Sequence, residues 1–131
     1  FASVPTLKPA IEFINLLNDN ELIMYQEKVR DYLLEYFRND VRIRLYGVPR
    51  GTADEKIPLF SFTVNGVHHE DLALILDKMG IAVRSGQMCA EPLMTRYGVT
   101  GMLRVSLAPY NTMEEAEYFV ECLDRAIGML I

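Results

Sequence analysis

The sequence contains no tryptophan, only two cysteines and two histidines, and no apolar run near the roughly 20 residues that span a bilayer. The missing run predicts that no helix crosses a membrane. Two cysteines are too few for the disulfide framework of a small secreted domain, so a reducing, cytoplasmic location is expected. Basic residues are in the minority as well, because 13 Lys and Arg against 18 Asp and Glu leave a net charge of −5. That balance argues against nucleic-acid binding.

The length and composition fit one globular domain. The chain has 131 residues, of which 50% are hydrophobic and 24% are charged, a balance typical of a folded domain. It begins Phe-Ala-Ser-Val-Pro, without an initiator Met, a basic leader or an apolar signal segment. We therefore expect residues 1–131 to form a single domain, and the opening is compatible with a piece of a longer protein.

Apolar residues spaced three and four apart predict five helices. They are expected over 7–17, 20–37, 69–79, 92–98 and 112–130. Asn20 is expected to cap the second helix, Pro92 to start the fourth and Gly98 to end it. Glu115 lies three residues after Thr112 and completes a capping box. The polar side of the second helix is predicted to be solvated and consists of Glu27, Lys28, Arg30 and Asp31.

Alternation of apolar and polar residues predicts four strands, over 41–45, 59–64, 81–84 and 102–107. Short turns between them favour antiparallel pairing. The segment 47–58 holds two Pro and two Gly and is expected to be a surface loop. The fold class predicted is therefore α+β, a two-layer small domain with a short, mainly antiparallel sheet flanked by helices. Arg42 and Arg44 are expected to be solvated charges of the first strand.

Cys89 is the residue with the clearest chemistry. It lies in a polar loop, 85–90, just before a helix whose N-terminus carries partial positive charge. Thiols in such places can have a lowered pKa and act as nucleophiles. Arg84, five residues upstream, adds positive charge if the loop folds back. The alternative is a small buried cysteine without reactivity, which is the expectation for Cys122 in the last helix.

Arg104 is the second candidate, because it interrupts an apolar strand and shares a face with Met102 and Ser106. A guanidinium held on a rigid strand suits two-point recognition of a carboxylate. The alternative is a solvated charge, as expected for the arginines of the first strand. His68 and His69 are expected at the start of a helix and lack metal-ligand spacing, so no metal site is predicted.

The segments around these residues resemble the C-terminal part of the SUF-type cysteine desulfurases, which are pyridoxal-phosphate enzymes of the class V aminotransferase family. The similarity rests on the segments Gly80-Ile-Ala-Val-Arg-Ser-Gly86, Cys89-Ala-x-Pro-Leu-Met94, Arg104-x-Ser106 and Tyr110-Asn-Thr112. It extends upstream through Gly66-Val-His-x-x-Asp71 and covers nearly the whole chain. The resemblance implies the fold of a pyridoxal-phosphate transferase C-terminal domain, here the small domain of a longer enzyme.

The resemblance also implies roles for the candidate residues. Cys89 would attack the sulfur of cofactor-bound L-cysteine, leaving alanine. It would carry the persulfide until a sulfur-acceptor protein takes the sulfur for iron–sulfur cluster assembly. Arg104 would hold the substrate's carboxylate, and Arg84 would shape the loop and the site. The complete enzyme would be a homodimer with pyridoxal 5'-phosphate as its cofactor.

The sequence departs from the family pattern in two places. Gln87-Met88 precedes Cys89 where the family has His-His, and no segment resembles the Ser/Thr-x-His-Lys that carries the Schiff-base lysine. We therefore expect no cofactor-binding residue in this chain, which should be inactive alone. Two alternatives stay open. One is a stand-alone sulfur-carrier or docking module, and the other is a class V lyase or aminotransferase with another amino-acid substrate.

Overall fold

The computed structural model describes residues 2–47 and 56–131, so residues 48–55 of the expected loop lie outside the described residues. It contains an antiparallel sheet in the order β1-β2-β4-β3. The strands are β1 (Ile43–Tyr46), β2 (Leu59–Val64), β3 (Arg84–Gly86) and β4 (Met102–Ser106). The helices are η1 (Val4–Thr6), α1 (Leu7–Leu17), α2 (Asn20–Asn39), α3 (His69–Lys78), α4 (Glu91–Tyr97) and α5 (Met113–Leu130). The predicted α+β class and antiparallel sheet are confirmed.

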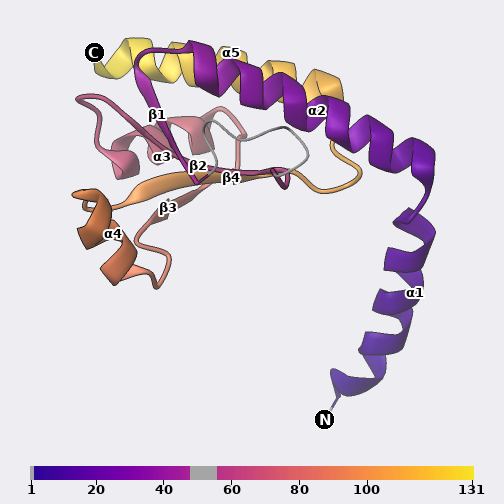
Figure 1. Ribbon diagram of the computed structural model, residues 1–131. Coiled ribbons are helices and arrows are strands. Elements are labelled where there is room, and N and C mark those ends of the chain that lie inside the picture. Colours follow the sequence, from indigo (N-terminus) through magenta and orange to yellow (C-terminus); the bar gives the residue numbers. More distant parts are fainter. Residues whose placement is uncertain (1, 48–55) are drawn as a thin grey trace.

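One face of the sheet packs under helices and forms the main core. Successive strand side chains point to opposite faces, so alternate residues of each strand reach this core. They are Ile43, Leu45, Phe60, Phe62, Val64, Leu103 and Val105. Phe37 of α2 lies against two of them, with ring centroids 5.2 Å from Phe60 and 4.8 Å from Phe62. Figure 1 shows α2 and α5 side by side over the sheet.

The opposite face of the sheet is polar and carries α4. Tyr46, Met94 of α4 and Met102 form a second, smaller apolar cluster there. α4 therefore lies on the side of the sheet away from α2 and α5 (Figure 1). Beyond this cluster the face is lined by the strand residues Arg44, Ser61, Thr63, Arg84 and Arg104. In the described ranges, no helix is long and apolar enough to cross a membrane.

Most predicted helix ends are confirmed. Thr112 and Glu115 form the capping box of α5, and Gly98 ends α4 at a φ of 69°. The cap of α2 was wrong by one residue. Asp19 accepts the backbone N–H groups of Glu21 and Leu22, and Asn20 is already helical, because a carboxylate just before a helix can reach those unpaired donors.

The first strand begins at Ile43, two residues later than predicted. Asp40 accepts the backbone N–H of Arg42 at 2.9 Å, and this turn keeps Val41 out of the sheet with 90% of its surface exposed. The third strand is displaced as well, to Arg84–Gly86. Ile81 donates its N–H to the Leu76 carbonyl at 3.0 Å, so the residues after α3 complete the helix end before any strand can form.

The predicted apolar stripe of α1 does not reach the core. No residue of α1 is buried, and the helix projects from the body of the molecule (Figure 1). Its exposed apolar residues are Leu7, Ile11, Phe13, Ile14 and Leu16. An apolar helix that covers nothing is a surface available to other protein.

Two arginines expected in solvent are instead held by carboxylates. Arg30 is 7% exposed and donates to Asp31 at 2.8 Å. Arg42 donates through Nε to both Asp40 oxygens, at 2.9 and 3.1 Å, and through its Nη2 to Asp40 and Asp124. Their long apolar stems pack while their charged ends stay paired. The sequence pattern shows only that these positions are polar and does not show this pairing.

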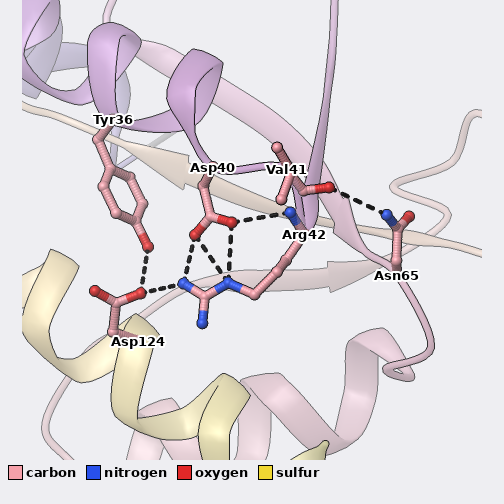
Figure 2. Close-up of polar contacts among 6 residues, drawn as sticks. All are labelled: Tyr36, Asp40, Val41, Arg42, Asn65 and Asp124. Atoms are coloured by element: carbon pink, nitrogen blue, oxygen red, sulfur yellow. Dashed lines mark hydrogen bonds and ion pairs between the residues drawn. The ribbon is translucent and has the colours of Figure 1, made fainter.

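The contacts of Arg42 join three elements that are distant in the sequence. Figure 2 shows Asp40 at the end of α2, Arg42 before β1 and Asp124 of α5 in one network. Tyr36 of α2 adds a hydrogen bond from its hydroxyl to Asp124 at 3.1 Å. Asn65, after β2, donates to the Val41 carbonyl at 3.4 Å. The network thus fixes α2, α5 and the sheet to one another at one end of the core.

Replacing Arg42 with Met should lower the free energy of unfolding by about 1–2 kcal/mol. Asp40, whose side chain is 10% exposed, would lose its charged partner while the apolar stem is kept. Urea unfolding at pH 7 measures the effect. Lys28→Met, at an exposed position of α2, is the control and should change stability by less than about 0.5 kcal/mol.

The same variant has a defined pH dependence. The hydrogen bonds from Arg42 hold the pKa of Asp40 below its ordinary value of 3.8. The stability that this carboxylate contributes is therefore present above that pH and is lost as the pH falls through the lowered pKa. The difference between parent and variant should shrink below pH 3.8, and an undiminished difference there would contradict the assignment.

Candidate functional site

Cys89 lies in a tight turn between β3 and α4, and its side chain is exposed. The Ala90 N–H donates to the Gln87 carbonyl at 3.0 Å and closes the turn. Met88 and Cys89 have φ values of 54° and 60°, and among the described residues they alone are left-handed without being glycine. Such backbone costs on the order of 1–3 kcal/mol per residue and is found where the surrounding structure enforces it.

A cavity of about 320 Å³ lies beside this turn, between the polar face of the sheet and α4. Met88 and Ala90, the neighbours of Cys89 in the chain, both line it. Apolar side chains supply most of the wall, namely Tyr46, Leu59, Met88, Leu93, Met94, Tyr97 and Met102. The turn that carries Cys89 therefore borders a mainly apolar cavity, although Cys89 itself is not one of the lining residues.

Arg104 supplies a cation to the wall of this cavity. Its Nε is buried and has no hydrogen-bond partner among the described residues. A buried donor left unpaired costs about 1–3 kcal/mol, more when it is charged. None of the described lining residues is acidic, so a small anion in the cavity would satisfy this donor.

Arg84 lies directly opposite Arg104 across the β3–β4 pair. Residues directly opposite in antiparallel strands share a face, and their Cβ atoms are about 4.5–5.5 Å apart. Two like charges in that position repel each other. The prediction that Arg104 faces away from Leu103 and Val105 is confirmed, and the sheet brings the second predicted arginine beside it. Cys122, in contrast, is 2% exposed in the main core, as expected.

Two buried polar residues near this site carried no functional signal in the sequence. Lys56 lines the cavity, is 8% exposed and places its Nζ 5.1 Å from the centre of the Phe60 ring. Burial lowers its pKa. It precedes β2 in a Pro- and Gly-containing segment, where nothing in the pattern predicts burial.

His69 is the other such residue. His68 caps α3 and His69 begins it, as predicted. His69 is 9% exposed, and its Nδ1 lies 2.8 Å from the Ser85 Oγ of β3. Burial and the neighbouring His68 lower its pKa, against smaller opposing effects of Glu70 and Asp71. In the described part of the chain, no group of three His, Cys, Asp or Glu side chains could hold a metal ion.

The described residues do not form a site for pyridoxal phosphate. Three of the four lysines, Lys8, Lys28 and Lys78, are exposed on helices. An amine exposed in this way is not placed to form a Schiff base with the aldehyde of an enclosed cofactor. The fourth, Lys56, directs its amine to the Phe60 ring. What the cavity offers is an unpaired guanidinium, which suits an anion such as a substrate carboxylate.

Comparison with known proteins places these features in a family. The sequence profile described as "Aminotransferase class-V" matches residues 1–119. The "Probable cysteine desulfurase" of Xylella fastidiosa (strain Temecula1) is 39% identical over 124 residues, which are 95% of this chain and 29% of that protein. "Cysteine desulfurase CsdA" of Escherichia coli (strain K12) is 48% identical over 73 residues, 56% of this chain and 18% of that protein.

Solved structures show the same similarity. The crystal structure of the cysteine desulfurase CsdA from Escherichia coli matches with a TM-score of 0.71 and 33% identity, over 86% of this chain and 27% of that one. A cysteine desulfurase from Thermococcus onnurineus matches with a TM-score of 0.70 and 34% identity, over 80% and 26%. The chain spans less than a third of the length of these relatives. On the match over residues 1–119, together with this fold, the chain belongs to the class-V aminotransferase family.

Proposed function

We propose that this chain is the C-terminal small domain of a longer cysteine desulfurase, in which Cys89 takes sulfur from L-cysteine and Arg104 binds the substrate's carboxylate. The observation that carries the proposal is the pairing of a strained, exposed thiol with a cavity whose buried guanidinium Nε lacks a partner. The relatives named cysteine desulfurase support the substrate. The SUF-type assignment and the role in iron–sulfur cluster assembly stay predictions.

In this proposal the two arginines orient the substrate. Arg104 donates hydrogen bonds to the carboxylate from its free Nε and a terminal nitrogen, since a guanidinium can bind a carboxylate at two points. Arg84, directly opposite on β3, adds positive charge on the solvent side. A carboxylate between them removes the repulsion of the like charges. The apolar wall then excludes water from the remainder of the substrate.

Cys89 acts on the sulfur of the oriented substrate. Its thiolate attacks that sulfur, so a sulfur–sulfur bond forms on Cys89 while the carbon–sulfur bond of cysteine breaks and the carbon skeleton, after protonation, leaves as alanine. In the longer enzyme, pyridoxal phosphate bound by the remainder of the polypeptide would supply the electron sink that this cleavage needs. The turn leaves the Cys89 thiol exposed, where a sulfur-acceptor protein can reach the persulfide.

The remaining parts of the proposal concern the complete protein. We expect it to be a homodimer, as the family resemblance implies. Both cysteines are unpaired, which suits a reducing, cytoplasmic location.

The arginine pair should attract an anionic reagent to Cys89. The test is the ratio of alkylation rates by iodoacetate, which carries a carboxylate, and by neutral iodoacetamide, measured at low salt from the Cys89 peptide by mass spectrometry. Arg84→Met and Arg104→Met should each lower the ratio by about two- to threefold. Arg125→Met, on α5 across the sheet, is the control and should leave it unchanged. A ratio insensitive to both site arginines would overturn their role.

In the polypeptide that joins this chain to its cofactor-binding part, Cys89→Ala should abolish the release of alanine from L-cysteine. Cys122→Ala is the matched control and should retain it, because that thiol is enclosed by the core. Alanine is measured by chromatography with and without a reductant. Normal turnover by Cys89→Ala would sink the assignment. Cofactor binding without turnover of cysteine would favour a class V enzyme with another substrate.

The exposed face of α1 should pack against the remainder of the longer polypeptide. In the isolated chain, the double change Ile11→Asp and Ile14→Asp should alter the free energy of unfolding by less than about 0.5 kcal/mol, since no residue of α1 is buried. Leu33→Asp, at a fully buried position of α2, should unfold it. In the longer polypeptide the same double variant of α1 should lower Tm by several degrees.

A stop codon just upstream of the codon for Phe1 would overturn the domain proposal and favour the carrier module.

A further inference from the structure

β3 is a short edge strand whose pairing is opposed by charge. It has three residues and, among the described strands, borders β4 alone. The pairing puts Arg84 directly opposite Arg104, and like charges in this position are destabilising. A strand this short, at an edge, gains little from its ladder. Some further contact must therefore hold it in register.

That contact comes from α3, on the other face of the strand. Ser85 alternates with Arg84 and so points to the side of the sheet on which Leu103, its pairing partner, is buried. His69, the first residue of α3, lies within hydrogen-bond distance of Ser85, with 2.8 Å between Nδ1 and Oγ. The imidazole thus ties the middle residue of β3 to a helix of the main core.

The same imidazole also contacts the residue that leads into β4. A Cβ placed on Gly101 would lie 2.4 Å from the Nε2 of His69, so only glycine lets the ring approach this closely. His69 therefore touches β3 through one ring nitrogen and the entrance of β4 through the other. Burial, which lowers the pKa of His69, favours the neutral ring and so avoids a third positive charge between two strands that carry arginines.

We propose that His69 is a positioning residue: its bond to Ser85 and its contact with Gly101 hold β3 in register on β4. In this way His69 keeps Arg84 beside Arg104 and the Cys89 turn at the rim of the cavity. The inference rests on the carboxylate-binding role proposed above for the two arginines. It adds that the geometry of the pair is set from the opposite face of the sheet, by a residue that need not touch the substrate.

The alkylation ratio at Cys89 tests this directly, because it reports the positive potential at the thiol and cancels changes in thiol reactivity common to both reagents. Ser85→Ala and His69→Phe remove the hydrogen bond and should each lower the ratio about two- to threefold, to the value of Arg84→Met. His69→Asn keeps a polar nitrogen near the position of Nδ1 and should restore most of the ratio. Far-UV circular dichroism checks that each variant is folded.

A second pair of variants tests the contact between the His69 ring and Gly101. Gly101→Ala should displace the ring and lower the ratio as His69→Phe does. Gly128→Ala, in α5 with no atom within 4 Å of the added Cβ, is the matched control and should leave the ratio at the parent value. If His69→Phe fails to fold, the nearly isosteric Ser85→Ala still decides the question.

The possible outcomes separate this inference from the proposed function. A ratio that falls in Arg84→Met but is unchanged in Ser85→Ala and Gly101→Ala overturns the role of His69 and leaves the arginine site standing. A ratio that ignores both site arginines overturns the carboxylate site and the positioning role together. A loss in Ser85→Ala, His69→Phe and Gly101→Ala with rescue by His69→Asn supports the positioning role.

Discussion

The pairing of β3 with β4 is the constraint on which the site depends. A strand of three residues offers few ladder hydrogen bonds, yet its register decides which side chains meet. A shift of one residue would turn Arg84 to the core side and bring Ser85 to the cavity side, because side chains alternate. The Cys89 turn begins directly after this strand, so its place at the rim of the cavity is set by the same register. A small local pairing thus controls the thiol and one arginine of the pair.

The energetically unfavourable features of this structure are concentrated at the pairing of β3 with β4. The unpaired Nε of Arg104, the opposed charges of the arginine pair and the left-handed backbone at Met88 and Cys89 all lie within or next to the β3–β4 unit. The remainder of the fold is conventionally packed, with Phe37 of α2 in contact with both Phe60 and Phe62 of the sheet. Strain persists only where the surrounding structure enforces it. The distribution therefore separates a stabilising core from a site that is held in an unfavourable arrangement.

Local signals explain which elements the sequence predicts well. The capping box of Thr112 and Glu115, the glycine after α4 and the alternation in β2 and β4 each act within a few residues, and all are present as expected. The alternation also predicts the face of Arg104. The failures are non-local. Partners 82 residues apart hold Arg42 in its network, and β3 lies three residues later than its apolar pattern indicates, because the end of α3 uses the residues in between.

The same distinction between local and non-local signals applies to the candidate site. Cys89 and Arg104 could be singled out from residue type and context, and resemblance to a family gave them roles. That Arg84 lies opposite Arg104 could not be predicted, since it depends on the register of a strand whose position the pattern misplaced. The role of His69 could not be predicted either, because its hydrogen bond joins residues 16 apart on different elements.

Two surfaces remain open in the described part of the chain, and the proposed function accounts for both. α1 presents its apolar residues to solvent, with Ile14 63% exposed, and the cavity holds the Arg104 Nε, which has no hydrogen-bond partner among the described residues. An apolar helix gains about 25 cal/mol for each Å² that it buries, and an unpaired guanidinium gains most from an anion shielded from water. A larger body that covers α1 and closes over the sheet face would supply both. The relatives are more than three times as long as the segment matched here, which leaves room for such a body. Under the proposed function, these two surfaces are the contacts of the small domain with the remainder of its enzyme.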